Sequence, residues 1–158
     1  MNDKVTTLLL LRRGDELLLA MKKRGWGVGK WNGVGGKIDV GETIEHAVVR
    51  ECQEEIGVTP LKCHKVAVHD FTVNSGQPDE WHMHTHTYLC DKWNGKPTET
   101  EEMAPKWFKI SEIPYDQMWQ DDRYWLPQVL DGKLLKTIFT FDRHDTMLSK
   151  IITEVSSL

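Results

Sequence analysis

The stretch between Thr43 and Gly57 most constrains how this chain can fold. It holds no glycine or proline before Gly57, Thr43 is a suitable N-cap, and Gly57 is a suitable left-handed stop, so it predicts a helix over residues 43–56. At about 100° per residue, one side of this helix is an apolar stripe formed by Ile44, Ala47, Val48 and Cys52. That stripe should pack against the rest of the protein.

The acidic residues of the helix continue this apolar stripe instead of opposing it. Glu51 and Glu55 fall about 20° to either side of Ile44 and Glu54 about 80° away, by the same step per residue. Carboxylates one turn apart raise each other's pKa, and partial burial adds a desolvation cost, so the cluster is unfavourable without a counter-cation. Mg²⁺ would supply that charge and keep positions for the oxygens of a diphosphate. Arg50, four residues before Glu54, could orient its carboxylate.

A glycine-rich segment before the helix argues against the alternative that these acids are a solvated surface run. Residues 23–41 contain seven glycines, so this part should be loop and short strand whose backbone approaches another group closely. Within it, Gly33-Val34-Gly35-Gly36-Lys37 places exposed backbone and a cation directly before the acidic helix. The spacing excludes the commoner phosphate loops, because a P-loop would need glycine at Trp31 and no G-x-G-x-x-G occurs.

The chain carries a net negative charge, so a polyanionic ligand must be bound by a local group of basic residues or through a metal ion. Twenty Lys and Arg against 24 Asp and Glu give a net charge of -4, which argues against a protein that binds duplex nucleic acid. Basic residues do gather around the glycine-rich segment, at Lys22, Lys23, Arg24, Lys30 and Lys37. Part of this group should be ordinary solvated side chains, and Lys22, at the end of a predicted strand, is our choice for a substrate contact.

The remaining pattern predicts a single α+β domain over residues 1–158. The predicted elements are strands over 5–11, 16–22, 61–73, 81–90, 106–110 and 135–141 and helices over 43–56 and 122–130. The first four strands should pair as two hairpins, through Arg12-Arg13-Gly14-Asp15 and through a polar turn at 74–79. Pro127 should lie in an early turn of the second helix, and the strand over 135–141 should be the last. Hairpin strands with helices between them indicate a mixed sheet, not a doubly wound one.

The cysteines and the N-terminus favour a cytoplasmic protein. Cys52, Cys63 and Cys90 are odd in number and form no C-x-x-C pair, so they predict neither a structural zinc site nor a disulfide framework. The apolar run from Val5 to Leu11 is closed by two arginines without a small-residue cleavage site, which predicts a strand and not a signal peptide or a spanning helix. We therefore expect no membrane partner.

Residues Gly36 to Val58 resemble the Nudix box, G-x5-E-x7-R-E-U-x-E-E-x-G-U. They match it at every fixed position, namely Gly36, Glu42, Arg50, Glu51, Glu54, Glu55 and Gly57. The resemblance implies a Nudix α/β/α sandwich that uses Mg²⁺, with Mn²⁺ as a substitute, to hydrolyse a nucleoside diphosphate linked to another group. It also implies that the Gly36 carbonyl, Glu51, Glu54 and Glu55 ligate the metal, with Arg50 in the same catalytic group.

Further stretches, Met21–Gly27 with Trp31–Gly33 and Met118–Trp125, are similar to the oxidised purine nucleoside triphosphate hydrolases of this family. That similarity implies that an acid at Glu102 assists the metal. It also implies a nucleotide pocket formed by Thr7, Lys22, Trp26, Asn32, Gly35, Gly36, Lys37, Phe71, Met83, Trp119, Asp121 and Asp122. Trp26 departs from the Phe familiar at its position, a change that bears on base preference.

Several of these pocket residues support nucleotide binding by their own chemistry. Trp119 offers a flat face for a purine, and such stacking contributes about 1–3 kcal/mol. Adjacent Asp121 and Asp122 should retain one proton between them, which gives a donor beside an acceptor on a purine edge, and Asn32 could add one of each from the opposite wall. The alternatives are a plain core tryptophan and an N-cap role for either aspartate.

Three histidines, His82, His84 and His86, alternate along a predicted strand. Their side chains therefore share one face and could bind a transition metal. Met83 and Thr85 take the opposite face. Because the family resemblance places Met83 toward the nucleotide, the histidines should lie outside the pocket.

Together these features predict a Mg²⁺-dependent pyrophosphohydrolase that converts oxidised purine nucleoside triphosphates, such as 8-oxo-dGTP or 2-hydroxy-dATP, to the monophosphate and diphosphate. It would cleanse the nucleotide pool, with a small nucleotide as partner and not duplex nucleic acid, and we expect a monomer. Two alternatives stay open: a Nudix hydrolase of RNA 5′ ends or dinucleoside polyphosphates, and a non-catalytic nucleotide-binding Nudix module. Non-catalytic modules usually lose acids of the box, and none is missing here.

Overall fold

The computed structural model describes residues 2–73 and 81–158, and the predicted turn at 74–79 lies outside them. The strands are β1 (Asn2–Arg13), β2 (Glu16–Lys22), β3 (Trp31–Asn32), β4 (Thr59–Val73), β5 (Trp81–Asn94), β6 (Met103–Lys109), β7 (Leu134–Phe141) and β8 (Met147–Val155). The helices are α1 (Ile44–Ile56) and α2 (Asp122–Leu130), with short 3-10 turns at Ile110–Glu112 and Tyr115–Gln117. None of the helices among these residues is long and apolar enough to cross a membrane.

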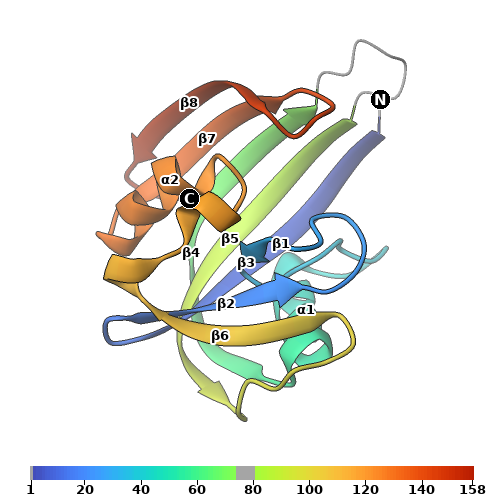
Figure 1. Ribbon diagram of the computed structural model, residues 1–158, viewed down its shortest axis with the longest axis vertical. Coiled ribbons are helices and arrows are strands. Elements are labelled where there is room, and N and C mark those ends of the chain that lie inside the picture. Colours follow the sequence, from blue (N-terminus) through green and yellow to red (C-terminus); the bar gives the residue numbers. More distant parts are fainter. Residues whose placement is uncertain (1, 74–80) are drawn as a thin grey trace.

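The strands form one mixed sheet in the order β3-β2-β1-β5-β4-β7-β8, with β6 paired to β2. β1 runs parallel to β5 and β4 parallel to β7, while the other pairs are antiparallel. The two helices lie on opposite faces of this curved sheet (Figure 1). The predicted α+β sandwich with a mixed sheet is therefore confirmed.

Alternating side chains of the central strands build one core under each helix. Successive residues of a strand point to opposite faces of the sheet. On β1, Leu9 belongs to the core that contains Val48 of α1, whereas Leu10 belongs to the core that contains Trp125 of α2. The two cores hold both helices against the sheet and so fix where their polar ends lie.

Helix α1 begins and ends as its sequence predicts. The Thr43 hydroxyl accepts a hydrogen bond of 3.1 Å from the backbone N–H of His46, and Gly57 adopts the left-handed conformation with φ 71°. The buried residues of the helix are Ala47, Val48, Cys52, Glu55 and Ile56. One carboxylate, that of Glu55, is thus buried together with the apolar stripe.

Both predicted hairpins are present. β1 and β2 place Leu11 opposite Leu18, and Gly14, with φ 59°, lies in the turn between them. β4 and β5 pair over a longer stretch, with Phe71 opposite Met83. The second hairpin carries β1 on one side and β7 on the other, so it forms the centre of the sheet.

Two predictions about the C-terminal part were wrong. The strand over 135–141 is not the last one, because β8 runs antiparallel to β7 at the edge of the sheet. Most residues of β8 are exposed, so its sequence lacks the alternation of apolar and polar residues by which a half-buried strand is recognised. Pro127 lies in the interior of α2 and not in an early turn, so the Arg123 carbonyl loses its usual helical donor.

Candidate active site

The glycine-rich segment is laid along β1 by backbone hydrogen bonds. The N–H of Thr7 donates to the Gly36 carbonyl at 2.9 Å, and Leu9 and Val34 exchange bonds of 2.6 and 3.0 Å. A Cβ added to Gly35 would lie 1.8 Å from the Thr7 carbonyl oxygen, so only glycine permits this approach. The Gly36 carbonyl keeps a second lone pair for a further ligand.

Glu51 and Glu55 of α1 lie beside this segment. Oε1 of Glu55 accepts a hydrogen bond of 2.9 Å from the N–H of Gly35, and the Glu51 carboxylate lies next to Gly36. Burial, and then the negative charge of Glu51, raise the pKa of Glu55 to about 8. A divalent cation would relieve this repulsion, and carboxylate and carbonyl oxygens are the donors that Mg²⁺ prefers. The site therefore fits such an ion.

Glu54 does not continue the buried face as predicted. Its side chain is 60% exposed, and Oε2 accepts a hydrogen bond of 3.3 Å from Nη1 of Arg50. Its place at the margin of the apolar stripe lets it reach solvent. Glu102, the acid expected to assist the metal, pairs with Arg24 at 3.3 Å. Among the described residues, these glutamates do not bring three ligand oxygens within 4.8 Å of one another.

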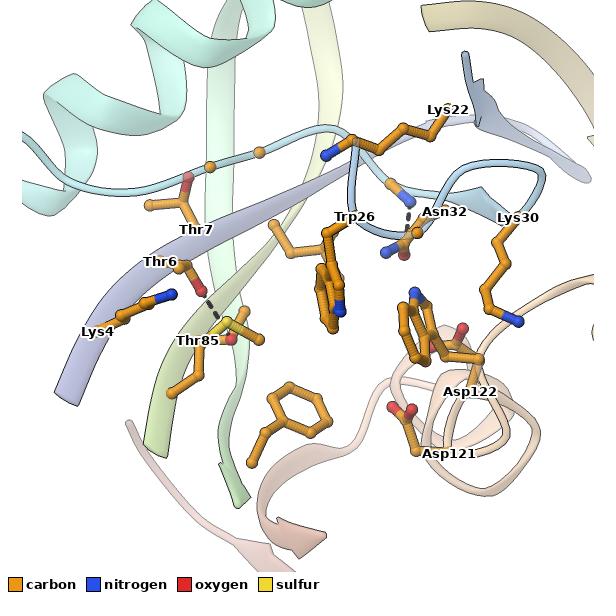
Figure 2. A pocket seen from close by; sticks show the side chains of 18 of the residues that line it. Lys4, Thr6, Thr7, Lys22, Trp26, Lys30, Asn32, Thr85, Asp121 and Asp122 are labelled. Atoms are coloured by element: carbon orange, nitrogen blue, oxygen red, sulfur yellow. Dashed lines mark hydrogen bonds between the residues drawn. The ribbon is translucent and has the colours of Figure 1, made fainter. Parts of the chain in front are cut away.

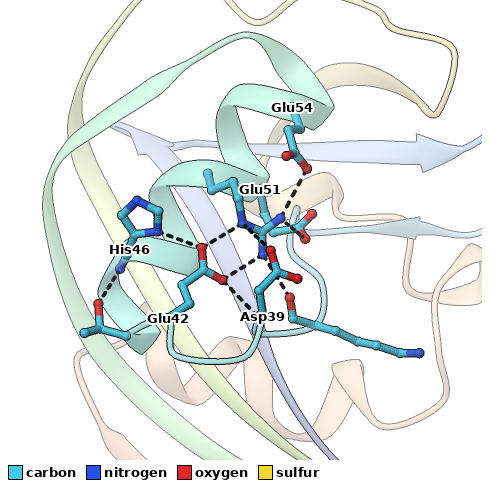
Figure 3. A network of polar contacts seen from close by, with 8 residues as sticks. Asp39, Glu42, His46, Glu51 and Glu54 are labelled. Carbon is cyan, nitrogen blue, oxygen red and sulfur yellow. Dashed lines mark hydrogen bonds and ion pairs between the residues drawn. The ribbon is translucent and has the colours of Figure 1, made fainter.

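Arg50 joins the acidic helix to the loop before it (Figure 3). Its guanidinium donates to both oxygens of Glu42, at 2.7 and 2.9 Å, and to Oε1 of Glu51 at 2.9 Å. It also donates to the Lys37 carbonyl at 3.0 Å. The hydrogen bond with Glu42 raises the pKa of Arg50, and Arg50 lowers the pKa of Glu42 to about 2. The spacing of the sequence predicts only the contact of Arg50 with Glu54, and the structure shows that Arg50 contacts Glu51 as well.

A cavity of about 470 Å³ opens beside the backbone of Gly35 and Gly36. All the residues expected to form the nucleotide pocket line it (Figure 2): Thr7, Lys22, Trp26, Asn32, Gly35, Gly36, Lys37, Phe71, Met83, Trp119, Asp121 and Asp122. Its walls come from β1, β4 and β5, from the glycine-rich segment and from the start of α2. Residues that suit phosphates and residues that suit a base thus share one space.

Aromatic rings and a lysine form one part of the cavity wall. Trp26 and Trp119 stack with ring centroids 4.5 Å apart and planes at 29°. Nζ of Lys30 lies 5.0 Å from the Trp119 ring, and Phe141 meets that ring edge-on at 6.3 Å. Trp119 is thus part of the cavity wall and not a plain core tryptophan, and the arrangement suits a flat, anionic ligand.

Asp121 and Asp122 point into the cavity where the chain enters α2 (Figure 2), and each is 3% exposed. Oδ2 of Asp121 accepts a hydrogen bond of 2.8 Å from the indole N–H of Trp125, whereas Oδ2 of Asp122 has no partner among the described residues. Burial raises the pKa of Asp121 to about 6, and burial and then the charge of Asp121 raise the pKa of Asp122 well above its usual value. The pair therefore keeps a proton. Asp121 makes no capping hydrogen bond, so the alternative N-cap role is wrong for it.

The cavity also contains residues that the sequence analysis did not single out. Lys4, Thr6 and Thr85 line it, and the hydroxyls of the two threonines are hydrogen-bonded at 2.8 Å. Thr85 could have been found, because it shares a strand face with Met83. Lys4 and Thr6 could not have been found from the sequence, because only the parallel pairing of β1 with β5 shows which face of β1 borders the cavity.

Comparisons with known proteins agree with this geometry. The family model described as NUDIX domain matches residues 1–129. The chain is 43% identical to the oxidized purine nucleoside triphosphate hydrolase of Danio rerio over 156 residues, 99% of this chain and 98% of that protein. The protein of the same name from Mus musculus is also 43% identical, over 98% of this chain and 97% of its own length. The crystal structure of a MutT protein from Bacillus halodurans covers 94% of this chain and 97% of its own with a TM-score of 0.82 and 25% identity. The complete box, the fold and these matches show that the chain belongs to the Nudix hydrolase family.

Proposed function

We propose that this protein hydrolyses oxidised purine nucleoside triphosphates, such as 8-oxo-dGTP and 2-hydroxy-dATP, to the monophosphate and diphosphate with Mg²⁺. One observation carries the proposal: a single cavity is lined both by the Gly35–Gly36 backbone with Lys37 and by Trp119 with the aspartate pair. A ligand that fills it would present phosphates to the first group and a purine to the second. The relatives from Danio rerio and Mus musculus are named for this activity. Hydrolysis by this protein would remove damaged nucleotides from the nucleotide pool.

The phosphate end of the cavity supports hydrolysis assisted by a divalent metal, which Nudix hydrolases use. The Gly36 carbonyl, Glu51, Glu54 and Glu55 would hold the ion, with Glu102 as an assisting acid. When bound, the cation neutralises phosphate oxygens and makes a coordinated water more acidic. Glu54 or its neighbour Glu55 would accept a proton from the attacking water. Arg50 would keep Glu51 and Glu54 in place.

The base end of the cavity supports recognition of a modified purine. Trp119 would stack on the base in the place where Trp26 now lies against its ring at 4.5 Å. The aspartate pair would offer a protonated donor beside an acceptor. Oδ1 of Asn32 accepts the N–H of Gly33 at 2.8 Å, which orients the amide so that its NH₂ group remains as a donor. These groups would distinguish an oxidised purine by the donors and acceptors on its edge.

Steady-state hydrolysis tests the proposal. We expect kcat/KM to be higher for 8-oxo-dGTP or 2-hydroxy-dATP than for dGTP and dATP, with release of diphosphate only when Mg²⁺ is present. Glu51→Gln should lower turnover by orders of magnitude without unfolding the chain, whereas Glu45→Gln, an exposed residue of the same helix, should leave it unchanged. Equal turnover of all four nucleotides, or preference for capped RNA or dinucleoside polyphosphates, would contradict the substrate. No hydrolysis of any of them would favour a nucleotide-binding module.

We further infer that the protein acts as a monomer in the cytoplasm. Cys52, Cys63 and Cys90 are free thiols, which suits a reducing compartment. Light scattering on the purified protein tests the monomer, and fractionation of the cells that make it tests the compartment.

A further inference from the structure

Two of the three alternating histidines meet an aspartate on the sheet face that points away from the cavity. Met83 and Thr85 of β5 line the cavity, so His82 and His84 project from the other side of the strand. β4 runs antiparallel beside β5 and places Asp70 directly opposite His84. The three side chains therefore come from two neighbouring strands and share one patch of surface.

The ligand atoms of this patch converge. Oδ1 of Asp70 lies 3.7 Å from Nε2 of His82 and contacts Nδ1 of His84. One ligand atom from each of the three residues lies within 4.8 Å of the other two, and the imidazole centroids are 4.3 Å apart. Oδ1 of Asp70 is shielded from solvent and makes no hydrogen bond within the described part of the chain. It is thus an oxygen donor between two nitrogen donors.

A second carboxylate holds the outer side of His82. Oδ1 of Asp3, on the adjacent strand β1, lies 3.6 Å from Nδ1 of His82. Histidines that ligate metals commonly have such a carboxylate on their other ring nitrogen, where it orients the ring. The side chains of His82, His84 and Asp70 are 26%, 38% and 36% exposed, so ions and water can reach the patch.

The donor set selects the kind of ion. Two imidazoles and one carboxylate suit a borderline transition metal, whereas Mg²⁺ prefers oxygen donors only. A tetrahedral Zn²⁺ has bonds of about 2.0–2.2 Å and so holds its ligand atoms about 3.4 Å apart. The distance of 3.7 Å between Oδ1 of Asp70 and Nε2 of His82 is close to this, and a rotation of the His84 side chain would open its contact with Asp70 for the ion.

We propose that Asp70, His82 and His84 form a Zn²⁺ site, separate from the Nudix box, that links β4 to β5, with water in the fourth position. His86 is not one of the ligands, because it lies two pairs further along the strands than His84, opposite Val68 and Thr7, and its Nδ1 is buried. The ion would stabilise the pairing of β4 with β5 in the centre of the sheet and would take no part in hydrolysis.

Calorimetric titration of the full chain with ZnCl₂ in excess MgCl₂ tests the site, because Mg²⁺ then occupies the oxygen ligands of the box. We expect one Zn²⁺ per chain and a higher melting temperature. Asp3→Asn should weaken binding by about 10- to 100-fold, and His84→Gln or Asp70→Asn should weaken it more. Co²⁺ in place of Zn²⁺ should give the intense visible absorption of a tetrahedral ion.

Matched variants separate this site from the box and from other histidines. His64→Gln changes an exposed histidine of β4 and should leave Zn²⁺ binding intact. Glu51→Gln should also leave it intact, and His84→Gln should hydrolyse nucleotide at the rate of the unaltered chain. The proposal is overturned by absence of Zn²⁺ uptake in excess Mg²⁺, by unchanged uptake in His84→Gln, or by its loss in Glu51→Gln. None of these outcomes depends on which nucleotide is the substrate.

Discussion

The Glu51 carboxylate lies so close to the backbone of Gly36 that a Cβ added there would come within 2.5 Å of Oε1 of Glu51. Glycine at position 36 therefore does more than allow a turn. It provides the space in which the carboxylate of one element meets the carbonyl of another, and both are the proposed metal ligands.

Gly36→Ala should consequently displace Glu51 and abolish most activity. The far end of a flexible side chain can move at small cost, so we expect the fold to persist while kcat falls by about 100-fold or more, as misplaced catalytic groups commonly cause. Hydrolysis rates and melting curves of the purified variant check this. Val40→Ala, a fully exposed change in the same loop, is the control. Normal turnover in Gly36→Ala would contradict the role given to Glu51.

Arg50→Lys should impair catalysis although the positive charge is kept. The single ammonium of a lysine cannot reproduce the planar fork with which three guanidinium nitrogens of Arg50 reach both oxygens of Glu42 and Oε1 of Glu51 at 2.7 to 2.9 Å. We expect kcat to fall by about 10- to 100-fold and a higher Mg²⁺ concentration to be needed, with KM for nucleotide little changed. Arg123→Lys alters an exposed pair with Asp116 and should affect neither quantity. A purely structural role for Arg50 would lower the melting temperature without changing the Mg²⁺ dependence.

Trp119→Ala should weaken nucleotide use through loss of the stacking surface. Stacking of a base on an aromatic ring contributes about 1–3 kcal/mol, so kcat/KM should fall on the order of 5-fold to 150-fold. The effect should appear mainly in KM. Trp93→Ala removes a ring from another stacked pair, Trp93 and Trp107 at 5.7 Å, outside the cavity, and should leave kcat/KM unchanged. A similar loss in both variants would indicate a stability effect and not base stacking.

Asp122→Asn should change how stability depends on pH. The pKa values of Asp121 and Asp122 are raised in the folded chain, so the pair keeps a proton at pH values where the unfolded chain, with an ordinary aspartate pKa of 3.8, has lost it. The contribution of Asp121 to the free energy of unfolding is therefore fully present below about pH 3.8 and is lost as pH rises through about 6. The contribution of Asp122 is likewise lost as pH rises, because its pKa is also raised. One proton changes this free energy by at most about 1.4 kcal/mol per pH unit. Denaturation measured from about pH 3 to about pH 7, roughly one unit beyond each end of that range, should show a free energy of unfolding that depends less on pH in Asp122→Asn.

The same substitution should also disturb base selection. Asparagine cannot switch between donor and acceptor by gaining or losing a proton, so the ratio of kcat/KM for 8-oxo-dGTP to that for dGTP should change. Asp116→Asn, an exposed aspartate near the same helix, is the control for both measurements. An unchanged ratio would argue against a role of the aspartate pair in reading the base.

Local features of this protein were readable from the chain alone. Thr43 and Gly57 delimit α1 because capping depends on neighbours within one helical turn. The two hairpins follow from apolar strands next to polar turns. The box residues, and the pocket residues implied by the family resemblance, come from stretches that each keep a recognisable local pattern, and the cavity brings those pocket residues together.

Other relationships depended on pairings between distant segments, which no local pattern encodes. The parallel contact of β1 with β5 brings Lys4 and Thr6 to the cavity, and β8 packs only because β7 offers it an edge.

The sequence by itself thus determined which groups we propose for the chemistry: the acids of the box, the glycines before them and the aspartate pair. Only the tertiary structure decided their states, because desolvation and charge pairing depend on every element that surrounds a side chain. It buried Glu55, turned Glu54 to Arg50, and set Asp70 beside His84 from another strand.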